Sequence, residues 1–374
     1  MEQKYAGHTL LQSVSFGNQR LASRLVMAPM TRIFSPNGIP GENVAHYYRR
    51  RAENGIGLII TEGTAINHPA AVMSPDIPRF YGEAALNGWK NVVNEVHEAG
   101  GKIIPQLWHV GAARRAGSEP NSDAPPVSPS GFTLRGQKNE KIKALTKNEV
   151  VEMIDTYAEA AANAKRIGFD GIELHGAHGY LIDQFFWEVT NKRDDVYGGD
   201  LGERTKFAAD IVRACRKAVG PDFPIVFRYS QWKGTDYQAK LANTSKELEQ
   251  FLTPLVEAGV DIFHCSTRRI WEPEFEEEDP SLNLAGWTKR LTKKPTIAVG
   301  SVGINRAYLS NQDHAQVTIE DNLSLIDEKI KAGEYDYVAV GRAVLADPEW
   351  AVKLKSGKLD QVTHYTKESE KYLI

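Results

Sequence analysis

The chain has 374 residues, of which 41% are hydrophobic and 25% are charged, and its formal net charge is -3. This is ordinary globular composition, and the weak charge argues against nucleic acid or an anionic membrane as a partner. Two cysteines are too few for a disulfide framework or for a four-cysteine iron–sulfur or zinc site on this chain. The first residues lack the apolar run of a signal peptide, and no segment is long enough to span a bilayer. We therefore expect a cytoplasmic protein, as a monomer or a homo-oligomer.

Eight short apolar segments rich in valine and isoleucine recur along the chain, and each is followed by a polar loop. Most are too continuously apolar to have a solvated face, which is typical of strands buried on both sides in a parallel sheet. In chain order they are residues 24–29, 57–63, 102–108, 170–176, 224–230, 260–266, 295–301 and 335–342.

The segments between these strands carry helix signals. Thr146 and Glu149 form a capping box before apolar residues at helical spacing, and Thr244 and Glu247 repeat the pattern. Strands and helices that alternate in this way predict an α/β protein, a single (β/α)8 TIM barrel spanning residues 1–374. An open doubly wound sheet is the alternative.

Two segments fall outside the repeat. Residues 7–23 have the pattern of a hairpin, which we expect to cap the N-terminal end of the barrel. Residues 110–145 form a long excursion rich in Pro, Gly and Ser after the third strand. Loops of this length are usually functional or disordered, and this one emerges at the barrel end where active sites lie. We interpret it as a lid, with a solvated surface insertion as the alternative.

Polar residues at the C-terminal ends of barrel strands are the candidates for chemistry. Gly300 and Ser301 end the seventh strand, and Gly341 and Arg342 end the eighth, where barrels commonly bind phosphate. Glycine lets backbone N–H groups approach an anion, and the arginine adds a forked cation. The alternative is a pair of ordinary turn glycines beside a surface arginine.

Gln106 and Arg228 lie on the third and fifth strands and face the same central space. A glutamine amide can pair with a uracil-like edge, both as donor and as acceptor. An arginine stabilises a ring that gains negative charge on reduction. Buried, hydrogen-bonded core groups are the alternative for either residue alone, and this alternative weakens because both occur together with the phosphate loops.

His175, His178 and Tyr180 stand in the stretch HGAHGY after the fourth strand. Two histidines could bind a metal, but no carboxylate or third histidine completes a zinc set, so we expect no metal. The histidines are better interpreted as donors to a carbonyl or nitro oxygen. Tyr180, with an ordinary pKa of about 10, is a candidate proton donor to a carbon that gains carbanion character. Simple packing is the alternative for this tyrosine.

These residues resemble the Old Yellow Enzyme family of FMN-dependent ene-reductases, nearly end to end. The most specific matches are HGAHGYLIDQF at 175–185 and NKRDDVYGGDLGERTKF at 191–207, the latter similar to the family's N-x-R-x-D-x-Y-G-G signature. The resemblance implies FMN as cofactor, NADPH or NADH as hydride donor, and ping-pong reduction of the C=C bond of a small enone or nitro substrate.

The resemblance also implies a role for each matched residue. Thr31 is similar to the donor to the flavin C4 carbonyl. The other implied roles are Pro29, Met30 and Gly63 beside the flavin ring, Gln106 at its pyrimidine edge, Arg228 near N1 and the C2 carbonyl, Gly300, Ser301, Gly341 and Arg342 at the phosphate, His175 and His178 on the substrate oxygen, Tyr180 as proton donor, and Trp108 in the substrate pocket.

Parts of the chain and of its function stay open at this point. The loop 266–287 is acidic with two tryptophans and has no residue-by-residue match, and the tail with Tyr365 and Tyr372 has no assigned place. A flavin-free aldolase or isomerase of phosphorylated sugars would also need phosphate loops, although no lysine stands at these strand ends. A flavin-binding redox protein without an alkene substrate is a further alternative. The natural substrate, the choice of NADH or NADPH and the stereochemistry are not predicted.

Overall fold

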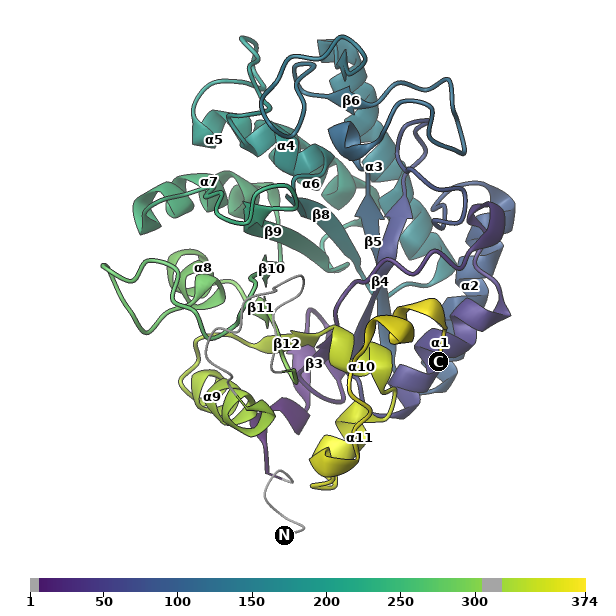
Figure 1. The fold of residues 1–374 in the computed structure, drawn as a ribbon, viewed down its shortest axis with the longest axis vertical. Helices are drawn as coiled ribbons and strands as arrows, with labels where there is room; N and C mark the ends of the chain where they lie inside the picture. The colour runs from purple at the N-terminus through teal and green to yellow at the C-terminus, as the bar shows by residue number, and fades with distance from the viewer. Residues whose placement is uncertain (1–6, 305–317) are drawn as a thin grey trace.

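A computed structural model describes residues 7–304 and 318–374. Eight of the described strands form a closed parallel barrel, in which each strand neighbours the next one along the chain (Figure 1). The barrel strands are β3 Leu25–Met27, β4 Leu58–Ala65, β5 Lys102–Trp108, β8 Ile172–His178, β9 Ile225–Lys233, β10 Ile262–Ser266, β11 Thr296–Val299 and β12 Tyr337–Val340. They coincide with the predicted segments, so the (β/α)8 barrel is confirmed and the open sheet is excluded.

Helices surround the barrel and connect its strands (Figure 1). The longer helices are α1 Glu42–Glu53, α2 Glu83–Glu98, α3 Lys147–Ile167, α6 Lys206–Val219, α7 Ser245–Ala258, α8 Leu284–Thr292 and α9 Ile319–Lys331. The shorter ones are α4 Leu181–Phe186, α5 Leu201–Arg204, α10 Arg342–Ala346 and α11 Trp350–Lys355, with 3-10 turns η1 Thr9–Leu11, η2 Pro36–Gly38, η3 Gly111–Ala113, η4 Leu359–Gln361 and η5 Lys367–Lys371. None of the helices within residues 7–304 and 318–374 combines the length and the apolar character that a membrane span requires.

Side-chain caps begin four of the longer helices, α3, α7, α8 and α9, and the first two were predicted. The predicted capping box of Thr146 and Glu149 is present at the start of α3, with both of its hydrogen bonds. At the start of α7, only one of the two hydrogen bonds of the predicted capping box is present. Thr244 accepts from the backbone N–H of Glu247, but the Glu247 carboxylate accepts from the N–H of Asn243 instead of that of Thr244.

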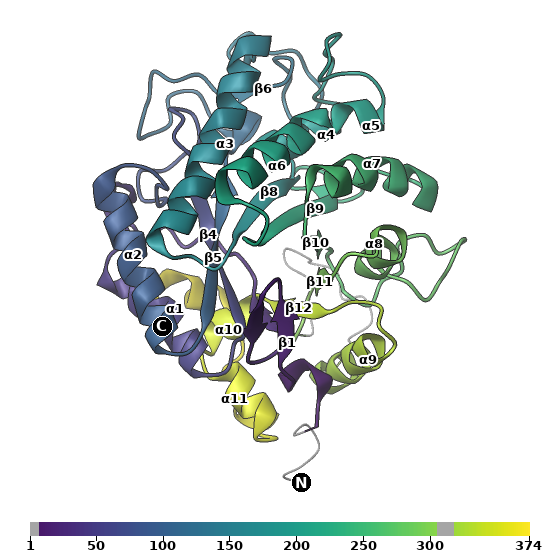
Figure 2. The ribbon, with the colours of Figure 1, turned by 180° about the vertical axis from the view of Figure 1, so that it is seen from behind.

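The predicted hairpin is present as β1 Val14–Phe16 and β2 Gln19–Leu21, and it closes the N-terminal end of the barrel (Figure 2). Phe16 and Leu21 are fully buried against the apolar side chains inside the barrel. Gly17, with a φ of 55°, turns the chain close to Pro224. An added Cβ would lie only 2.9 Å from the proline Cγ, so this position favours glycine. A site for ligands is therefore left to the opposite, C-terminal end.

The excursion 110–145 is an ordered structure on the outside of that opposite end. Its short strands β6 Val127–Ser128 and β7 Lys143–Ala144 pair with one another, and β6 lies against α4. The guanidinium of Arg114 donates to the carbonyl oxygens of Asn121 and Ser118, which holds the first part of the excursion together.

Candidate active site

A cavity of about 460 Å³ opens at the C-terminal end of the barrel strands. All the predicted site residues except Gly63 line it. These are Pro29, Met30, Thr31, Gln106, Trp108, His175, His178, Tyr180, Arg228, Gly300, Ser301, Gly341 and Arg342. The closed barrel brings them together because the C-terminal ends of parallel strands meet at one rim. None of the described lining residues comes from the excursion 110–145, so its role as a lid stays a prediction.

Gly63 lies behind the cavity wall. A Cβ added at this position would lie 2.5 Å from Cε3 of Trp108, the residue that separates Gly63 from the cavity. The glycine therefore allows the indole ring to pack close against β4. The contact of Gly63 with a flavin ring stays a prediction. The structure shows only that Gly63 leaves room for the Trp108 ring.

A buried hydrogen-bond network holds Gln106. Its Nε2 donates to Glu173 Oε1 at 2.7 Å, and Glu173 Oε2 accepts from His264 Nδ1 at 2.6 Å. Because a carboxylate only accepts, this contact fixes which end of the amide is the nitrogen. The other N–H of Gln106 and its carbonyl oxygen have no partner in the part of the chain that the structure describes, so they remain for a ligand. Neither Glu173 nor His264 was predicted as a site residue, because their part depends on contacts across three strands.

Arg228 provides a buried positive charge in the cavity. Its Nε has no hydrogen-bond partner among the described residues, and its Nη2 donates to the Ser266 hydroxyl at 3.4 Å. Burial lowers the pKa of the guanidinium, against the opposing effect of Glu173. A buried arginine nitrogen without a partner points to a ligand that accepts a hydrogen bond.

His175, His178 and Tyr180 form one aromatic cluster. The two imidazole rings are 5.2 Å apart, and the Tyr180 ring lies 5.0 Å from His175 and 4.9 Å from Trp108. Burial, followed by the charge of Arg228, holds the pKa of each histidine well below its ordinary value. Both histidines are therefore neutral at pH 7, and each has one N–H to donate. Burial raises the pKa of Tyr180, which keeps its hydroxyl protonated.

His178 stands in an unusual backbone conformation, with a φ of 65° in the left-handed region. Its Nε2 is 2.8 Å from the Ser266 hydroxyl oxygen, and its ring stacks on Trp232 at 4.3 Å. Neither Ser266 nor Trp232 was predicted as a site residue. Ser266 is the last residue of the predicted strand 260–266, and Trp232 lies two residues past the predicted strand 224–230, so a search for polar and aromatic residues at and just past the strand ends would have found both.

A further wall of the cavity comes from the loops after β9 and β10. The Arg268 guanidinium lies 3.8 Å over the ring of Tyr237, and both residues line the cavity. The acidic loop 266–287 therefore has one part in the cavity wall and another part on the surface. Its beginning, with Thr267 and Arg268, forms part of the site, while residues 276–278 are exposed on the surface.

The candidate phosphate loops lie where they were predicted. Gly300 has a φ of 153°, and an added Cβ would lie 2.6 Å from the Thr267 hydroxyl oxygen, so only glycine fits there. Arg342 lies 5.5 Å from the ring of Tyr365 in the C-terminal tail. The tail is thus placed beside this end of the cavity, and its Glu370 lines it.

Arg32 fastens the tail. Its guanidinium donates to the carbonyl oxygens of Tyr372 at 2.7 Å and Glu370 at 3.1 Å. Glu62 accepts in turn from the backbone N–H groups of Arg32 at 2.8 Å and Ile33 at 3.1 Å. Burial raises the pKa of Glu62 to about 7.

The signature at 191–199 lies outside the cavity lining and is structural. Arg193 forms an ion pair with Asp195 and donates to the carbonyl oxygen of Pro129 at 2.7 Å. An added Cβ at Gly198 would lie 1.9 Å from the Arg193 carbonyl oxygen. This motif therefore fastens the excursion 110–145 to the barrel and contributes no group to the cavity.

The cavity fits a flavin mononucleotide. Gln106 offers a donor and an acceptor for a uracil-like edge, the buried Nε of Arg228 has no partner within the described ranges, and glycine loops with Arg342 line the same cavity. No group of three or more His, Cys, Asp or Glu side chains within the described ranges is placed to hold a metal ion.

Comparisons with known proteins agree with this geometry. Residues 9–361 match the model of the NADH:flavin oxidoreductase / NADH oxidase family. The chain is 34% identical to an NADH oxidase of Thermoanaerobacter brockii over 353 residues, which cover 92% of this chain and 50% of that protein. The chain therefore spans about half the length of that relative.

Solved structures with the same fold include a morphinone reductase in complex with tetrahydroNAD, with a TM-score of 0.79 and 26% identity, covering 96% of this chain and 93% of that one. An Old Yellow Enzyme from Pichia sp. AKU4542 has a TM-score of 0.79 and 25% identity, covering 98% of this chain and 90% of that one.

Proposed function

Because the chain belongs to the NADH:flavin oxidoreductase / NADH oxidase family, we propose that it is an FMN-dependent ene-reductase that uses NADH or NADPH. Its substrates are small α,β-unsaturated carbonyl or nitro compounds. The observation that carries this proposal is one cavity in which His175, His178 and Tyr180 face the flavin-type residues Gln106 and Arg228.

The chain's own groups would hold FMN at its two ends. Gln106 would pair with the pyrimidine edge, Arg228 would offer its positive charge to the same ring, and Thr31 would donate to the C4 carbonyl. The phosphate would be held by Gly300, Ser301, Gly341 and Arg342, and the ring would contact Pro29 and Met30. When bound, FMN supplies a two-electron carrier that accepts a hydride from the nicotinamide and returns it to the substrate.

The two histidines hold the substrate's carbonyl or nitro oxygen. Each is neutral at pH 7 and donates one N–H, so together they withdraw electron density from the conjugated double bond. Ser266 and Trp232 fix the plane of the His178 ring from its edge and its face. This grip makes the β-carbon of the substrate electron-poor, which is the condition for accepting a hydride.

Tyr180 supplies the proton that completes the reduction. Its raised pKa keeps the phenolic hydrogen in place at neutral pH, and the ring meets both His175 and Trp108 edge-on. The hydroxyl transfers its proton to the α-carbon as the β-carbon receives hydride, and solvent then reprotonates the phenolate. The substrate gains one hydride and one proton, and the nicotinamide is oxidised.

A second candidate function is favoured by one relative. The chain is 34% identical to an NADH oxidase, so a flavin-dependent oxidase that passes electrons to an acceptor other than an alkene is the competing proposal. The two differ in which acceptor reoxidises the reduced protein, the enone or oxygen.

An absorbance titration tests the proposal. The purified chain with FMN is reduced anaerobically with NADPH or NADH and then mixed with 2-cyclohexenone. Bleaching followed by return of the flavin spectrum is expected. Return with oxygen alone would favour the oxidase, and a chain that takes up no FMN would contradict both functions.

A further inference from the structure

We propose that the buried ion pair of Asp183 and Lys233 is a positioning device that holds the left-handed turn at 178–179 and thereby sets the His178 ring against the cavity. The inference rests on the proposed function in one respect, since that function gives His178 the substrate oxygen to hold. Neither member of the pair lines the cavity, so both act through His178.

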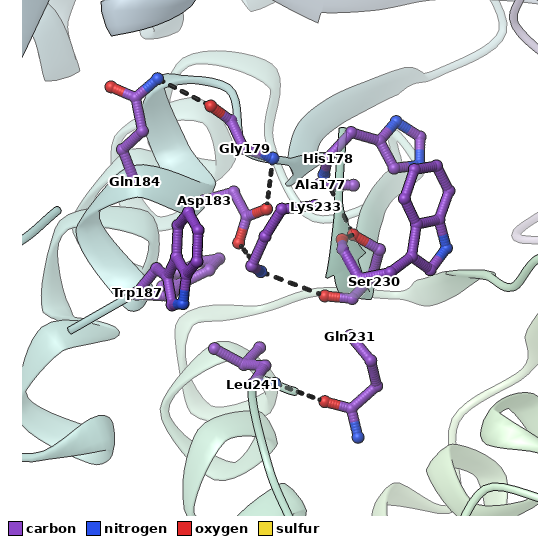
Figure 3. Close-up of polar contacts among 12 residues, drawn as sticks. Ala177, His178, Gly179, Asp183, Gln184, Trp187, Ser230, Gln231, Lys233 and Leu241 are labelled. Atoms are coloured by element: carbon purple, nitrogen blue, oxygen red, sulfur yellow. Dashed lines mark hydrogen bonds and ion pairs between the residues drawn. The ribbon is translucent and has the colours of Figure 1, made fainter. Parts of the chain in front are cut away.

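The pair is fully buried. Lys233 Nζ lies 2.6 Å from Asp183 Oδ1, and both side chains are 0% exposed (Figure 3). Lys233 is the last residue of β9, whereas Asp183 lies in α4, so the contact joins two elements. The Trp187 ring, 5.8 Å from Nζ, covers the ammonium on another side. Apolar replacement of such a pair is often neutral or stabilising, so stability alone does not account for it.

The other oxygen of Asp183 reaches the turn that carries His178. Asp183 Oδ2 accepts from the backbone N–H of Gly179 at 2.7 Å, as Figure 3 shows. Gly179 has a φ of 84° and His178 a φ of 65°. The left-handed backbone conformation is costly for an L-residue such as histidine, and it persists only where neighbouring contacts hold it. Asp183 supplies such a contact at the second residue of the turn.

The Lys233 end of the pair holds the same turn from β9. The backbone N–H of Gly234, the next residue, donates to the His178 carbonyl oxygen at 3.0 Å. The His178 N–H donates to the Ser230 hydroxyl at 3.0 Å, and Lys233 Nζ lies 3.5 Å from the Ser230 carbonyl oxygen. The β8–β9 register also shifts between Gly176 and His178, where His178 comes opposite Lys233.

The consequence appears at the His178 ring. A right-handed backbone at this position would turn the side chain away from its present direction, in which it stacks on Trp232 and meets Ser266. The ion pair therefore acts on the cavity from behind, by fixing one backbone conformation. Substrate contact remains with His178.

The test replaces both charges at once with apolar side chains, in the variant Asp183→Leu/Lys233→Met loaded with FMN. We expect its thermal midpoint and FMN affinity to stay close to the wild type. Phenol, titrated through the flavin absorbance, should bind about 10- to 100-fold more weakly, the range for losing hydrogen bonds to charged groups. In a His178→Ala background the same double replacement should cause no further loss of phenol affinity, because coupled residues are not additive.

The matched control is Asp170→Leu/Lys102→Met. Asp170 also accepts from a lysine, at 3.0 Å, and from a backbone N–H, that of Ile103 at 2.8 Å, but it lies at the opposite end of the barrel. This variant should keep the phenol affinity of the wild type. Should the first variant fail to fold, Asp183→Asn/Lys233→Met keeps an acceptor for Gly179, and about a three- to tenfold loss is expected from the weaker neutral bond.

Phenol affinity within twofold of the wild type in the folded double variant would overturn the inference, as would an equal loss with and without His178. A wild-type protein that binds FMN but no phenol would instead contradict the proposed function, before any variant is made. Amide hydrogen exchange at residues 178–180 then decides the inference by itself. Faster exchange in the double variant supports it, and unchanged exchange overturns it.

Discussion

The Nε2 atom of His178 lies 2.8 Å from the hydroxyl oxygen of Ser266, which joins the ends of β8 and β10 across the intervening strand β9. The same hydroxyl accepts from Arg228 at 3.4 Å. Ser266 thus connects the histidine proposed to hold the substrate with the arginine proposed to lie beside the flavin.

Removal of that hydroxyl should weaken the grip on the substrate oxygen. In Ser266→Ala, the His178 ring loses one neutral hydrogen bond, which corresponds to about 1 kcal/mol. We expect phenol to bind roughly two- to tenfold more weakly, with a similar rise in KM for an enone, while FMN affinity changes little. Ser281→Ala, at an exposed serine, is the control. Equal phenol affinity in the two variants would show that the hydroxyl does not orient His178.

The hydroxyl of Tyr180 should matter only for the step that uses a proton. Tyr180→Phe is expected to slow enone reduction by about 10²- to 10⁴-fold, the usual contribution of a positioned acid. Stopped-flow reduction of the flavin by nicotinamide should keep its wild-type rate.

The control for this variant is Tyr157→Phe. Tyr157 is a buried tyrosine of α3, and its hydroxyl has no partner among the described residues. The Tyr157→Phe variant should leave the rates of both half-reactions unchanged. An unaltered rate of enone reduction in Tyr180→Phe would exclude Tyr180 as the donor.

Glu62 should make stability depend on pH. Its pKa rises from 4.5 to about 7 on folding, chiefly because burial disfavours the charge. A raised pKa means that the unfolded chain loses its proton first, so the contribution of Glu62 is complete below pH 4.5 and is lost as pH rises through 7. The free energy of unfolding of Glu62→Gln, relative to wild type, should therefore increase by about 3 kcal/mol between pH 4 and pH 8.

Denaturant unfolding at a series of pH values measures this effect. Glu257→Gln, on the exposed face of α7, serves as the control. A difference between Glu62→Gln and wild type that stays constant across the pH range would contradict the raised pKa.

The close approach of the Trp108 ring should make any side chain larger than glycine unfavourable at position 63. In Gly63→Ala the new methyl group meets the Trp108 ring at 2.5 Å, so the ring must move toward the cavity. We expect a loss of about 1–3 kcal/mol in the free energy of unfolding, together with weaker phenol binding. Gly7→Ala, where nothing lies within 4 Å, is the control. Unchanged stability and near-ultraviolet circular dichroism in Gly63→Ala would contradict the close contact.

The amino-acid sequence by itself determined the barrel and most of its rim. Buried strands are continuous apolar runs, and several of these runs carry polar residues that line the cavity at the C-terminal face, as Gln106 and Arg228 do. These are local patterns, so they survive without knowledge of the fold. The family prediction is likewise confirmed by the matching family model and by the related structures.

Tertiary structure alone decided which groups meet across strands. Ser266 lies 88 residues from His178, and Lys233 lies 50 residues from Asp183, so neither contact leaves a periodic signal in the chain. The structure also assigned the signature around Arg193 to the anchoring of a loop and brought Glu370 of the tail to the cavity. The reason is that strand burial is a property of short segments, whereas the partners of a polar side chain are chosen only when the barrel closes.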